Sequence, residues 1–316
     1  MRVIFMGTPE LAATVLHRLV EEKYDVVLCV TQPDKPVGRH GSVLQPSAVK
    51  QYALEKGIPV LQPEKMKDAA FVETLRSYQA NLQVVVAFRM LPEVVWAMPA
   101  YGTFNVHAAL LPQYRWAAPI NWAIINGETK TGVTTFFLDH DIDTGRIILQ
   151  KPFDIPDNAD VEYVYDGLMH LGAEICLETI EAIIASEGHP ASIPQEELQG
   201  ELKAAPKIFK ETCEINWQQS AKQVYDFIRG LSPIPGAWTT LVASDGKETV
   251  LKVYRASKTS HSSSAEPGTI VIEGKSLFVA CLNGELLQLE ELQLAGKKRM
   301  SAKDFLNGNQ AIKKMK

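Results

Sequence analysis

The sequence predicts an α/β protein with an N-terminal, mostly parallel, doubly wound sheet and a smaller C-terminal β-barrel. Through the first half of the 316-residue chain, short apolar runs alternate with stretches of helical spacing. This alternation is typical of parallel strands that are buried on both faces. After residue 237, short strand-like runs are separated by glycines and polar turns, as in small barrels. Between the two parts, residues 190–206 include three prolines and are typical of a linker.

The chain begins with a predicted βα unit. Residues 2–6 (Arg-Val-Ile-Phe-Met) predict a buried strand, which ends in a turn at Gly7. We expect Thr8 to cap the next helix and Pro9 to be its first residue. Apolar residues then recur at helical spacing, namely Leu11, Val15, Leu16 and Leu19. The dinucleotide-binding fingerprint G-x-G-x-x-G requires three glycines, and this turn has only Gly7. The turn therefore does not indicate a nucleotide site.

The remaining elements of the N-terminal part follow in order. Residues 26–31 and 82–87 predict apolar strands, and residues 71–78 predict a helix between them. Asn105 and His107 follow near the end of the next strand. A long helical stretch, residues 162–184, ends this part of the chain.

The C-terminal part begins after the linker with a short predicted helix, residues 221–230. Five strand-like runs follow, at residues 238–242, 249–253, 269–272, 277–280 and 286–289. We therefore predict three segments: a catalytic domain (1–189), a linker (190–206) and a β-barrel domain (207–316).

The charge differs between the two parts of the chain. The whole protein has a formal charge of −5, but residues 205–316 contain 16 basic and 11 acidic residues. The last 20 residues contain seven basic residues and one acidic residue. A basic part beside an acidic one indicates a polyanionic partner, although a solvated, frayed basic tail would give the same pattern.

The cysteines and the hydropathy restrict the class of protein. Cys29, Cys176, Cys213 and Cys281 lie far apart without a CxxC pair, which argues against a zinc site and a disulfide framework. No apolar run approaches the roughly 20 residues of a membrane span, and the N-terminus lacks the features of a signal peptide. We expect a cytoplasmic protein.

Asn105, His107 and Asp143 form the candidate catalytic group. Asn105 and His107 are two residues apart, so their side chains point to the same face of an extended strand. An amide and a protonated imidazole can stabilise the oxyanion that forms when an amine attacks a carbonyl group. A carboxylate can take the proton that the amine releases, or keep the imidazole charged. This pattern is suggestive of acyl transfer to an amine.

Other interpretations of these residues are weaker or remain open. One histidine and one aspartate leave a zinc ion short of ligands, so we expect no metal. The G-x-S-x-G elbow of serine hydrolases is missing. A histidine near a strand end is often structural, and Asp143-Thr144-Gly145 alone would be an ordinary turn.

The wider sequence resembles the folate-dependent formyltransferases, and among them the branch that formylates initiator tRNA. The resemblance covers essentially the whole chain in order. Its main signature is Phe-Asn-Val-His-Ala-Ala-Leu-Leu-Pro-Gln-Tyr-Arg at 104–115, followed by Ala117-Ala118-Pro119-Ile120. Further matching motifs are Gly7-Thr8-Pro9-Glu10 and residues 31–39, 138–145, 205–210 and 228–233.

This resemblance implies a fold, a reaction and a set of substrates. The fold would be a Rossmann-like formyltransferase domain followed by an OB-like barrel. The reaction would move a formyl group from 10-formyltetrahydrofolate, without a metal, to the α-amine of methionine on initiator tRNA. Asn105, His107 and Asp143 match the family's catalytic residues. The resemblance also implies that a monomer acts on the tRNA and the folate, away from any membrane.

The resemblance also implies two groups of binding residues. Those that would border the pterin pocket are Phe88, Arg89, Met90, Leu91, Ala109, Leu110, Leu111, Pro112 and Asp141. The loop 37–45 would contact the acceptor end of the tRNA, and the barrel would bind phosphates through contacts that are sensitive to salt. The residues that would contact tRNA are Arg39, Lys207, Arg229, Lys297, Lys298 and Arg299.

The chain departs from the family pattern at three places. Ala109 stands where the family usually has Ser, which removes a hydroxyl group near the pocket. Trp116 stands where the family usually has Gly, and an indole side chain does not adopt positive φ at low cost. The loop 40–44 has fewer basic residues than is usual, which places more of the expected tRNA contact on the C-terminal domain.

Two alternative functions remain at this stage. A formyltransferase acting on an amino sugar would use the same catalytic domain. A folate- or RNA-binding protein without catalytic activity would be consistent with Ala109 and Trp116, but the presence of Asn105, His107 and Asp143 argues against it.

Overall fold

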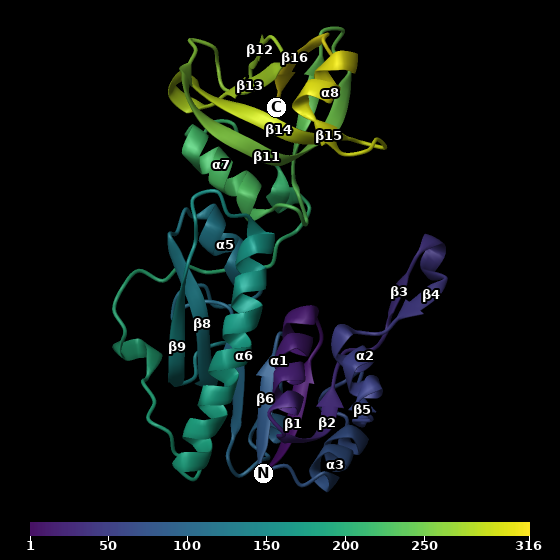
Figure 1. Cartoon of the computed structure of the whole chain (residues 1–316), viewed down its shortest axis with the longest axis vertical. Coiled ribbons are helices and arrows are strands. Elements are labelled where there is room, and N and C mark those ends of the chain that lie inside the picture. The colour runs from purple at the N-terminus through teal and green to yellow at the C-terminus, as the bar shows by residue number, and fades with distance from the viewer. The chain divides into compact units, whose positions relative to one another are not determined.

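A computed structural model describes residues 1–316 and divides them into two compact units. Unit 1 comprises residues 1–116, 131–153 and 165–204, and unit 2 comprises residues 117–130, 154–164 and 205–316. The structure confirms the predicted fold class. Unit 1 contains a mostly parallel sheet with helices on both faces, and unit 2 contains an antiparallel barrel (Figure 1).

The sheet of unit 1 has seven strands in the order β5-β2-β1-β6-β7-β8-β9. Its strands are β1 (Arg2–Gly7), β2 (Asp25–Val30), β5 (Val60–Leu61), β6 (Leu82–Val86), β7 (Thr103–His107), β8 (Lys130–Phe137) and β9 (Ile147–Asp154). The first five strands in this order, from β5 through β2, β1 and β6 to β7, pair in parallel, whereas β8 runs antiparallel to β7. The fully buried run of β6 shows why the parallel part of the sequence is almost continuously apolar.

Helices cover both faces of this sheet. On one face, Gly172 of α6 (Val161–Ala185) lies against Val106 of β7 and Val15 of α1 (Glu10–Glu21). On the other face, α3 (Ala69–Ser77) buries Phe71 and Leu75 against apolar residues of β1, β2 and β6. Two short helices, α2 (Ala48–Glu55) and α4 (Glu93–Trp96), complete the unit.

The predicted start of the first helix is wrong by one residue, because α1 begins at Glu10. Pro9 is the N-cap, and it cannot supply a side-chain hydrogen bond. The hydroxyl of Thr8 instead accepts hydrogen bonds from Thr31 and from the backbone N–H of Gln32. Thr8 therefore stabilises the contact between the ends of β1 and β2 rather than the helix.

Unit 2 contains the predicted barrel. Its strands are β10 (Ala237–Ala243), β11 (Glu248–Ser262), β12 (Ile270–Glu273), β13 (Ser276–Ala280), β14 (Glu285–Leu294), β15 (Met300–Ser301) and β16 (Ile312–Met315). They are antiparallel in the order β12-β13-β14-β11-β10-β16, with β15 beside β14. A bridge between Thr269 and Lys314 joins the two ends and nearly closes the barrel.

Three helices belong to unit 2. The predicted helix is present as α7 (Ala221–Gly230), which begins with a capping box between Ser220 and Gln223. Val224 and Ile228 of α7 and Phe305 of α8 (Ala302–Gly308) lie in the barrel core. The third helix, α5 (Pro119–Ile125), packs on α7, where Asn121 donates a hydrogen bond to the carbonyl of Gly230.

The two units differ from the sequential division 1–189, 190–206 and 207–316. Residues 117–130 and 154–164 pack within unit 2, because α5 contacts α7 and the segment before α6 contacts Arg229. The long-range packing of these short segments has no signature in the local sequence. No helix of the protein is both long and apolar enough to cross a membrane.

A hairpin extends from unit 1 (Figure 1). It consists of β3 (Lys35–Val37), a 3₁₀ turn η1 (Arg39–Gly41) and β4 (Val43–Gln45), and all of its strand residues are exposed. Polar contacts fix its base: the Asp34 carboxylate accepts hydrogen bonds from Lys50 at 2.9 Å and from Gln62 at 2.7 Å. The Lys50 and Gln62 hydrogen bonds lower the pKa of Asp34 below its ordinary value of 3.8.

We expect Asp34→Asn to reduce stability at neutral pH and to have less effect in acid. Because the folded-state pKa of Asp34 is lowered, its stabilising contribution is complete above pH ~4 and is lost as the pH falls through the lower folded-state pKa. Thermal unfolding of both proteins between pH 7 and pH 2.5 measures the difference. A difference in Tm that does not change with pH would contradict the ion-pair explanation. Asp25→Asn, which removes an exposed carboxylate, is the control.

Candidate active site

Strand β7 carries two of the predicted site residues, Asn105 and His107. Asn105 pairs with Val85 of β6 and Phe136 of β8, and His107 pairs with Thr134. The carbonyl oxygen of the Asn105 side chain is buried and has no hydrogen-bond partner in the protein. An unsatisfied buried acceptor costs about 1–3 kcal/mol, so this atom is a candidate for contact with a ligand.

Backbone and side-chain groups fix the His107 ring. Its Nε2 lies 2.8 Å from the carbonyl oxygen of Tyr114. Because a carbonyl only accepts, Nε2 carries a hydrogen, and Nδ1 is the nitrogen that can gain or lose a proton. Nδ1 lies 3.8 Å from Oδ2 of Asp143. This distance suits an ion pair with a protonated ring but is too long for a hydrogen bond.

Asp143 approaches His107 from the segment that follows β8. The backbone N–H of Leu138 bonds to the carbonyl of Thr103 at the start of β7, and five residues later the Asp143 carboxylate faces His107. The Asp143 carboxylate accepts a hydrogen bond from the backbone N–H of Trp116 at 2.8 Å. The structure therefore brings Asp143 to His107, and His107 shares strand β7 with Asn105.

The turn around Asp143 requires glycine at position 145. A Cβ atom on Gly145 would lie 1.6 Å from the carbonyl oxygen of Phe137, which is far inside van der Waals contact. Asp143 itself has a φ of 57°, in the left-handed region. Thr144 closes the turn by donating to the Asp139 carboxylate at 2.8 Å. The Asp-Thr-Gly sequence therefore has both a structural and a chemical explanation.

The loop after His107 is held by two polar side chains of β8 and β9. Thr134 donates to the Ala109 carbonyl at 2.6 Å and accepts from the Leu111 N–H at 3.1 Å. Gln150 donates to the Leu111 carbonyl at 2.8 Å. The side chains of Ala109, Leu111 and Pro112 are buried, whereas Leu110 is partly exposed. Of these predicted pocket residues, Leu110 has the side chain most accessible to a ligand.

Four of the other predicted pocket residues follow β6, and the fifth, Asp141, follows β8. Met90 is 64 % exposed, and Phe88 is partly exposed, whereas Leu91 is in the core on the α3 side of the sheet. Arg89 donates to the carbonyls of Glu64 and Pro63, and burial lowers the pKa of its guanidinium. Arg89 thus stabilises the loop before α3, and Met90 is the most exposed side chain of this segment. Asp141 is exposed.

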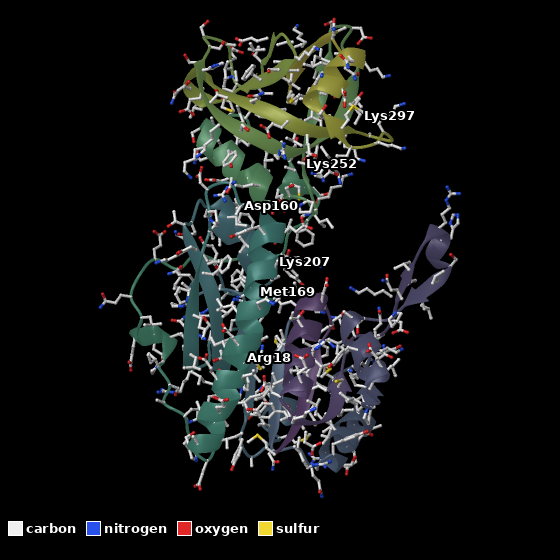
Figure 2. All side chains as sticks on the ribbon, in the orientation of Figure 1. Arg18, Asp160, Met169, Lys207, Lys252 and Lys297 are labelled. Carbon is white, nitrogen blue, oxygen red and sulfur yellow. The ribbon has the colours of Figure 1, made fainter.

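The residues predicted to contact tRNA fall into two groups. Arg39 is exposed in the hairpin of unit 1. In unit 2, Lys207 lies over the ring of Phe209. Lys297, Lys298 and Arg299 are exposed in the turn between β14 and β15. Lys207 and Lys297 are labelled in Figure 2. Arg299 also stacks on Tyr254 and bonds to Glu291.

Arg229 differs from the other predicted tRNA contacts because it is buried. Only 7 % of its surface is exposed, and its guanidinium bonds to the Asp226 carboxylate at 2.8 Å and to the Ala159 carbonyl at 2.9 Å. A phosphate contact would require Arg229 to give up these partners. The sequence motif around Arg229 is thus explained by packing within unit 2, and we leave Arg229 out of the proposed tRNA contacts.

Three side chains that contact the loops around His107 and Asp143 are not among the predicted site residues: Thr134, Gln150 and Gln195. Thr134 and Gln150 lie in strands β8 and β9, which are not predicted from the sequence, and Gln195 lies in the predicted linker. No group of three His, Cys, Asp or Glu side chains is close enough to hold a metal ion. The site thus offers an amide, an imidazole and a carboxylate.

These three groups can promote nucleophilic attack on a carbonyl. The Asn105 amide and a protonated His107 Nδ1 can stabilise negative charge on oxygen, and one such donor typically contributes about 3–4 kcal/mol. The Asp143 carboxylate lies at ion-pair distance from Nδ1 of the ring and can accept a proton from the attacking group.

Two family models match this chain. Residues 1–180 match the model described as formyl transferase, and residues 207–310 match the model of the formyl transferase C-terminal domain. Among curated relatives, a methionyl-tRNA formyltransferase from Parabacteroides distasonis is 57 % identical over 99 % of this chain and 97 % of its own length. The enzyme of the same name from Flavobacterium johnsoniae is 47 % identical over 98 % of this chain and 96 % of its own length.

Solved structures with the same fold have lower sequence identity. HypX from Aquifex aeolicus, in complex with tetrahydrofolic acid, has a TM-score of 0.62 and 17 % identity, covering 97 % of this chain and 47 % of HypX. WlaRD, a sugar 3N-formyl transferase solved with dTDP and 5-N-formyl-THF, has a TM-score of 0.64 and 17 % identity, covering 94 % of this chain and 99 % of WlaRD. At this identity, the likeness concerns the fold alone.

We expect Trp116→Gly to be more stable than Trp116→Ala. Trp116 has a φ of 90°, which glycine adopts freely and which strains any residue with a Cβ atom by ~1 kcal/mol or more. Both variants keep the backbone N–H that bonds to Asp143, and both remove an indole that is 51 % exposed. Urea unfolding measures the difference, and equal free energies of unfolding would show that this backbone is not strained.

Proposed function

The chain belongs to the formyl transferase family, and we propose that it transfers a formyl group from 10-formyltetrahydrofolate to the α-amine of the methionine carried by initiator tRNA. The observation that carries this proposal is the match to methionyl-tRNA formyltransferases over almost the full length of both chains, at up to 57 % identity. That match includes the second unit as well as the catalytic sheet. An N-formylmethionyl-tRNA product would serve translation initiation.

In the proposed reaction, the α-amine attacks the formyl carbon. A new C–N bond forms, and the carbonyl electrons move onto oxygen as negative charge. We assign the stabilisation of that charge to the Asn105 amide and the protonated Nδ1 of His107. Collapse of the intermediate breaks the bond between the formyl carbon and N10 of the folate. The proton that the amine loses balances the proton that N10 gains.

Asn105, His107 and Asp143 each have a separate role in this reaction. Asn105 has a buried side-chain oxygen without a protein partner, which supports a hydrogen bond from the attacking amine, and its NH₂ group is the donor assigned to the oxyanion. His107 is held through Nε2 by the Tyr114 carbonyl, which leaves Nδ1 for proton exchange. Asp143, fixed by the Trp116 N–H, can accept the proton of the amine and pass it toward N10.

We propose that the folate is bound beside these residues. Phe88, Met90 and Leu110 have side chains that a pterin ring can contact, and the backbone of residues 88–91 offers hydrogen-bonding groups. Arg89, Leu91, Leu111 and Pro112 then support the pocket through packing. The tetrahydrofolate and formyl-THF named for the related structures support a folate donor.

We propose that the tRNA is bound electrostatically. Arg39 in the hairpin and Lys207, Lys297, Lys298 and Arg299 in unit 2 are exposed cations. Residues 205–316 have 16 basic and 11 acidic residues, and such an excess attracts phosphates without reading sequence.

The main test is formyl transfer by the purified protein. We expect transfer of labelled formyl groups from 10-formyltetrahydrofolate to methionyl initiator tRNA, and little transfer to an amino sugar. His107→Ala should lower kcat by at least ~100-fold, because it removes a donor to the oxyanion, and should leave the tRNA affinity within ~threefold. Transfer to the sugar alone would reject the proposed acceptor, and a His107→Ala variant as active as the wild type would reject the catalytic role.

A pair of lysine substitutions tests the tRNA contact. Lys297→Ala combined with Lys298→Ala should weaken tRNA binding by ~3- to 10-fold at low salt and should reduce the salt dependence of binding. The matched control is Lys247→Ala with Lys275→Ala, which removes the same charge from two other exposed turns of unit 2. Equal effects of the two pairs would indicate attraction by the net charge rather than by the turn at residue 297.

A further inference from the structure

Residues 192–204, which we call the strap, lie in the stretch that the sequence predicts as a linker. The strap is bound to unit 1 along its length. Arg146 donates to the hydroxyl and the carbonyl of Ser192, each at 2.8 Å, and Ile193 exchanges two backbone hydrogen bonds with Ile147. Leu198 packs on the buried side chains of Leu111, Phe136 and Ile147.

The other end of the strap is bound to the segment that holds His107. The Tyr114 N–H donates to the Lys203 carbonyl at 2.7 Å, and the Lys203 N–H donates to the Gln113 side chain at 2.8 Å. Arg115 and Ala204 form a β-bridge. The strap therefore joins the turn at residues 143–145 to the segment 113–116.

One side chain in the strap, Gln195, contacts both of these segments. It is 2 % exposed. Its Nε2 donates to the backbone carbonyls of Asp143 at 2.9 Å and of Gly145 at 2.8 Å. Its Oε1 accepts from Nη2 of Arg115 at 2.8 Å and from Nε at 3.2 Å. All the hydrogen-bonding capacity of the amide is used, and only an amide offers two donors and an acceptor at this place.

These contacts bear directly on His107. The group that faces its Nδ1, Asp143, is on one of the joined segments, and the group that binds its Nε2, the Tyr114 carbonyl, is on the other. We propose that Gln195 is a positioning residue that keeps the two partners of His107 in register. The inference rests on the proposed function for its kinetic consequence, because Gln195 acts on the reaction only through His107 and Asp143.

Gln195→Met tests the proposal because it keeps the length and volume of the side chain and removes its hydrogen bonds. We expect kcat for formyl transfer to fall by ~10- to 100-fold, since misplacement of catalytic groups by about 1 Å can have that effect. The KM values for the folate and for methionyl-tRNA should stay within ~threefold. Gln195→Glu keeps the acceptor for Arg115 but loses the donors to the two carbonyls, and we expect the same decrease in kcat.

The matched control is Arg146→Met. It removes the contact between the same turn and the strap through Ser192, but it leaves the partners of Gln195 intact. We expect a decrease in Tm comparable to that of Gln195→Met and a kcat near that of the wild type. A comparable loss of kcat in Arg146→Met would show that any loosening of the strap is sufficient, and would overturn the specific role of Gln195.

A second measurement does not depend on the substrate. We expect the ¹⁵N resonances of the His107 ring to move in Gln195→Met and to stay in place in Arg146→Met. Unchanged resonances and kcat in a folded Gln195 variant would overturn the proposal. If the wild type itself fails to formylate methionyl-tRNA, the proposed function fails and the NMR result still decides the positioning role. If Gln195→Met does not fold, Gln195→Asn, which keeps an amide on a shorter side chain, replaces it.

Discussion

The fixed orientation of the His107 ring is the constraint on which the site depends. A ring on a strand end can rotate, and a rotated ring would present the wrong nitrogen to a substrate. The Tyr114 carbonyl binds Nε2 at 2.8 Å, and Asp143 faces Nδ1 at 3.8 Å. Neither partner is on the same element as His107: Tyr114 follows it by seven residues, and Asp143 follows strand β8. The loops that carry them must therefore be held in place for the ring to be useful.

The backbone around the site is strained where those loops turn. Tyr114, Trp116 and Asp143 have φ values of 58°, 90° and 57°. Each positive φ at a residue with a side chain costs energy, and such residues persist only where surrounding contacts require them. Here the contacts are the Trp116 N–H bond to Asp143 and the amide of Gln195. This strain is consistent with a site whose geometry is set by function.

Unit 2 contains two kinds of basic residue, those buried in its fold and those exposed on its surface. Arg229 is buried against Asp226 and backbone carbonyls, and Asp226 also accepts from Lys222 at 2.6 Å. A buried arginine of this kind stabilises the fold only because its partners satisfy it. Lys297 and Lys298 lie in an exposed turn instead. Basic residues that look equivalent in the sequence thus differ, because Arg229 is surrounded by hydrogen-bond acceptors whereas Lys297 and Lys298 are surrounded by water.

The sequence alone predicts the fold class, which the structure confirms, most of the elements, and the three candidate catalytic residues Asn105, His107 and Asp143. Apolar runs predict parallel strands because those strands are buried on both faces, and the trio stands out because polar side chains at a strand end are poorly explained by packing. The structure was needed to show that Arg229 is buried, that residues 117–130 and 154–164 belong with unit 2, and that the predicted linker binds the turn that carries Asp143. These features depend on contacts such as Gln195 to Asp143, 52 residues apart. Local patterns of hydropathy and turn residues contain no information about such distant partners.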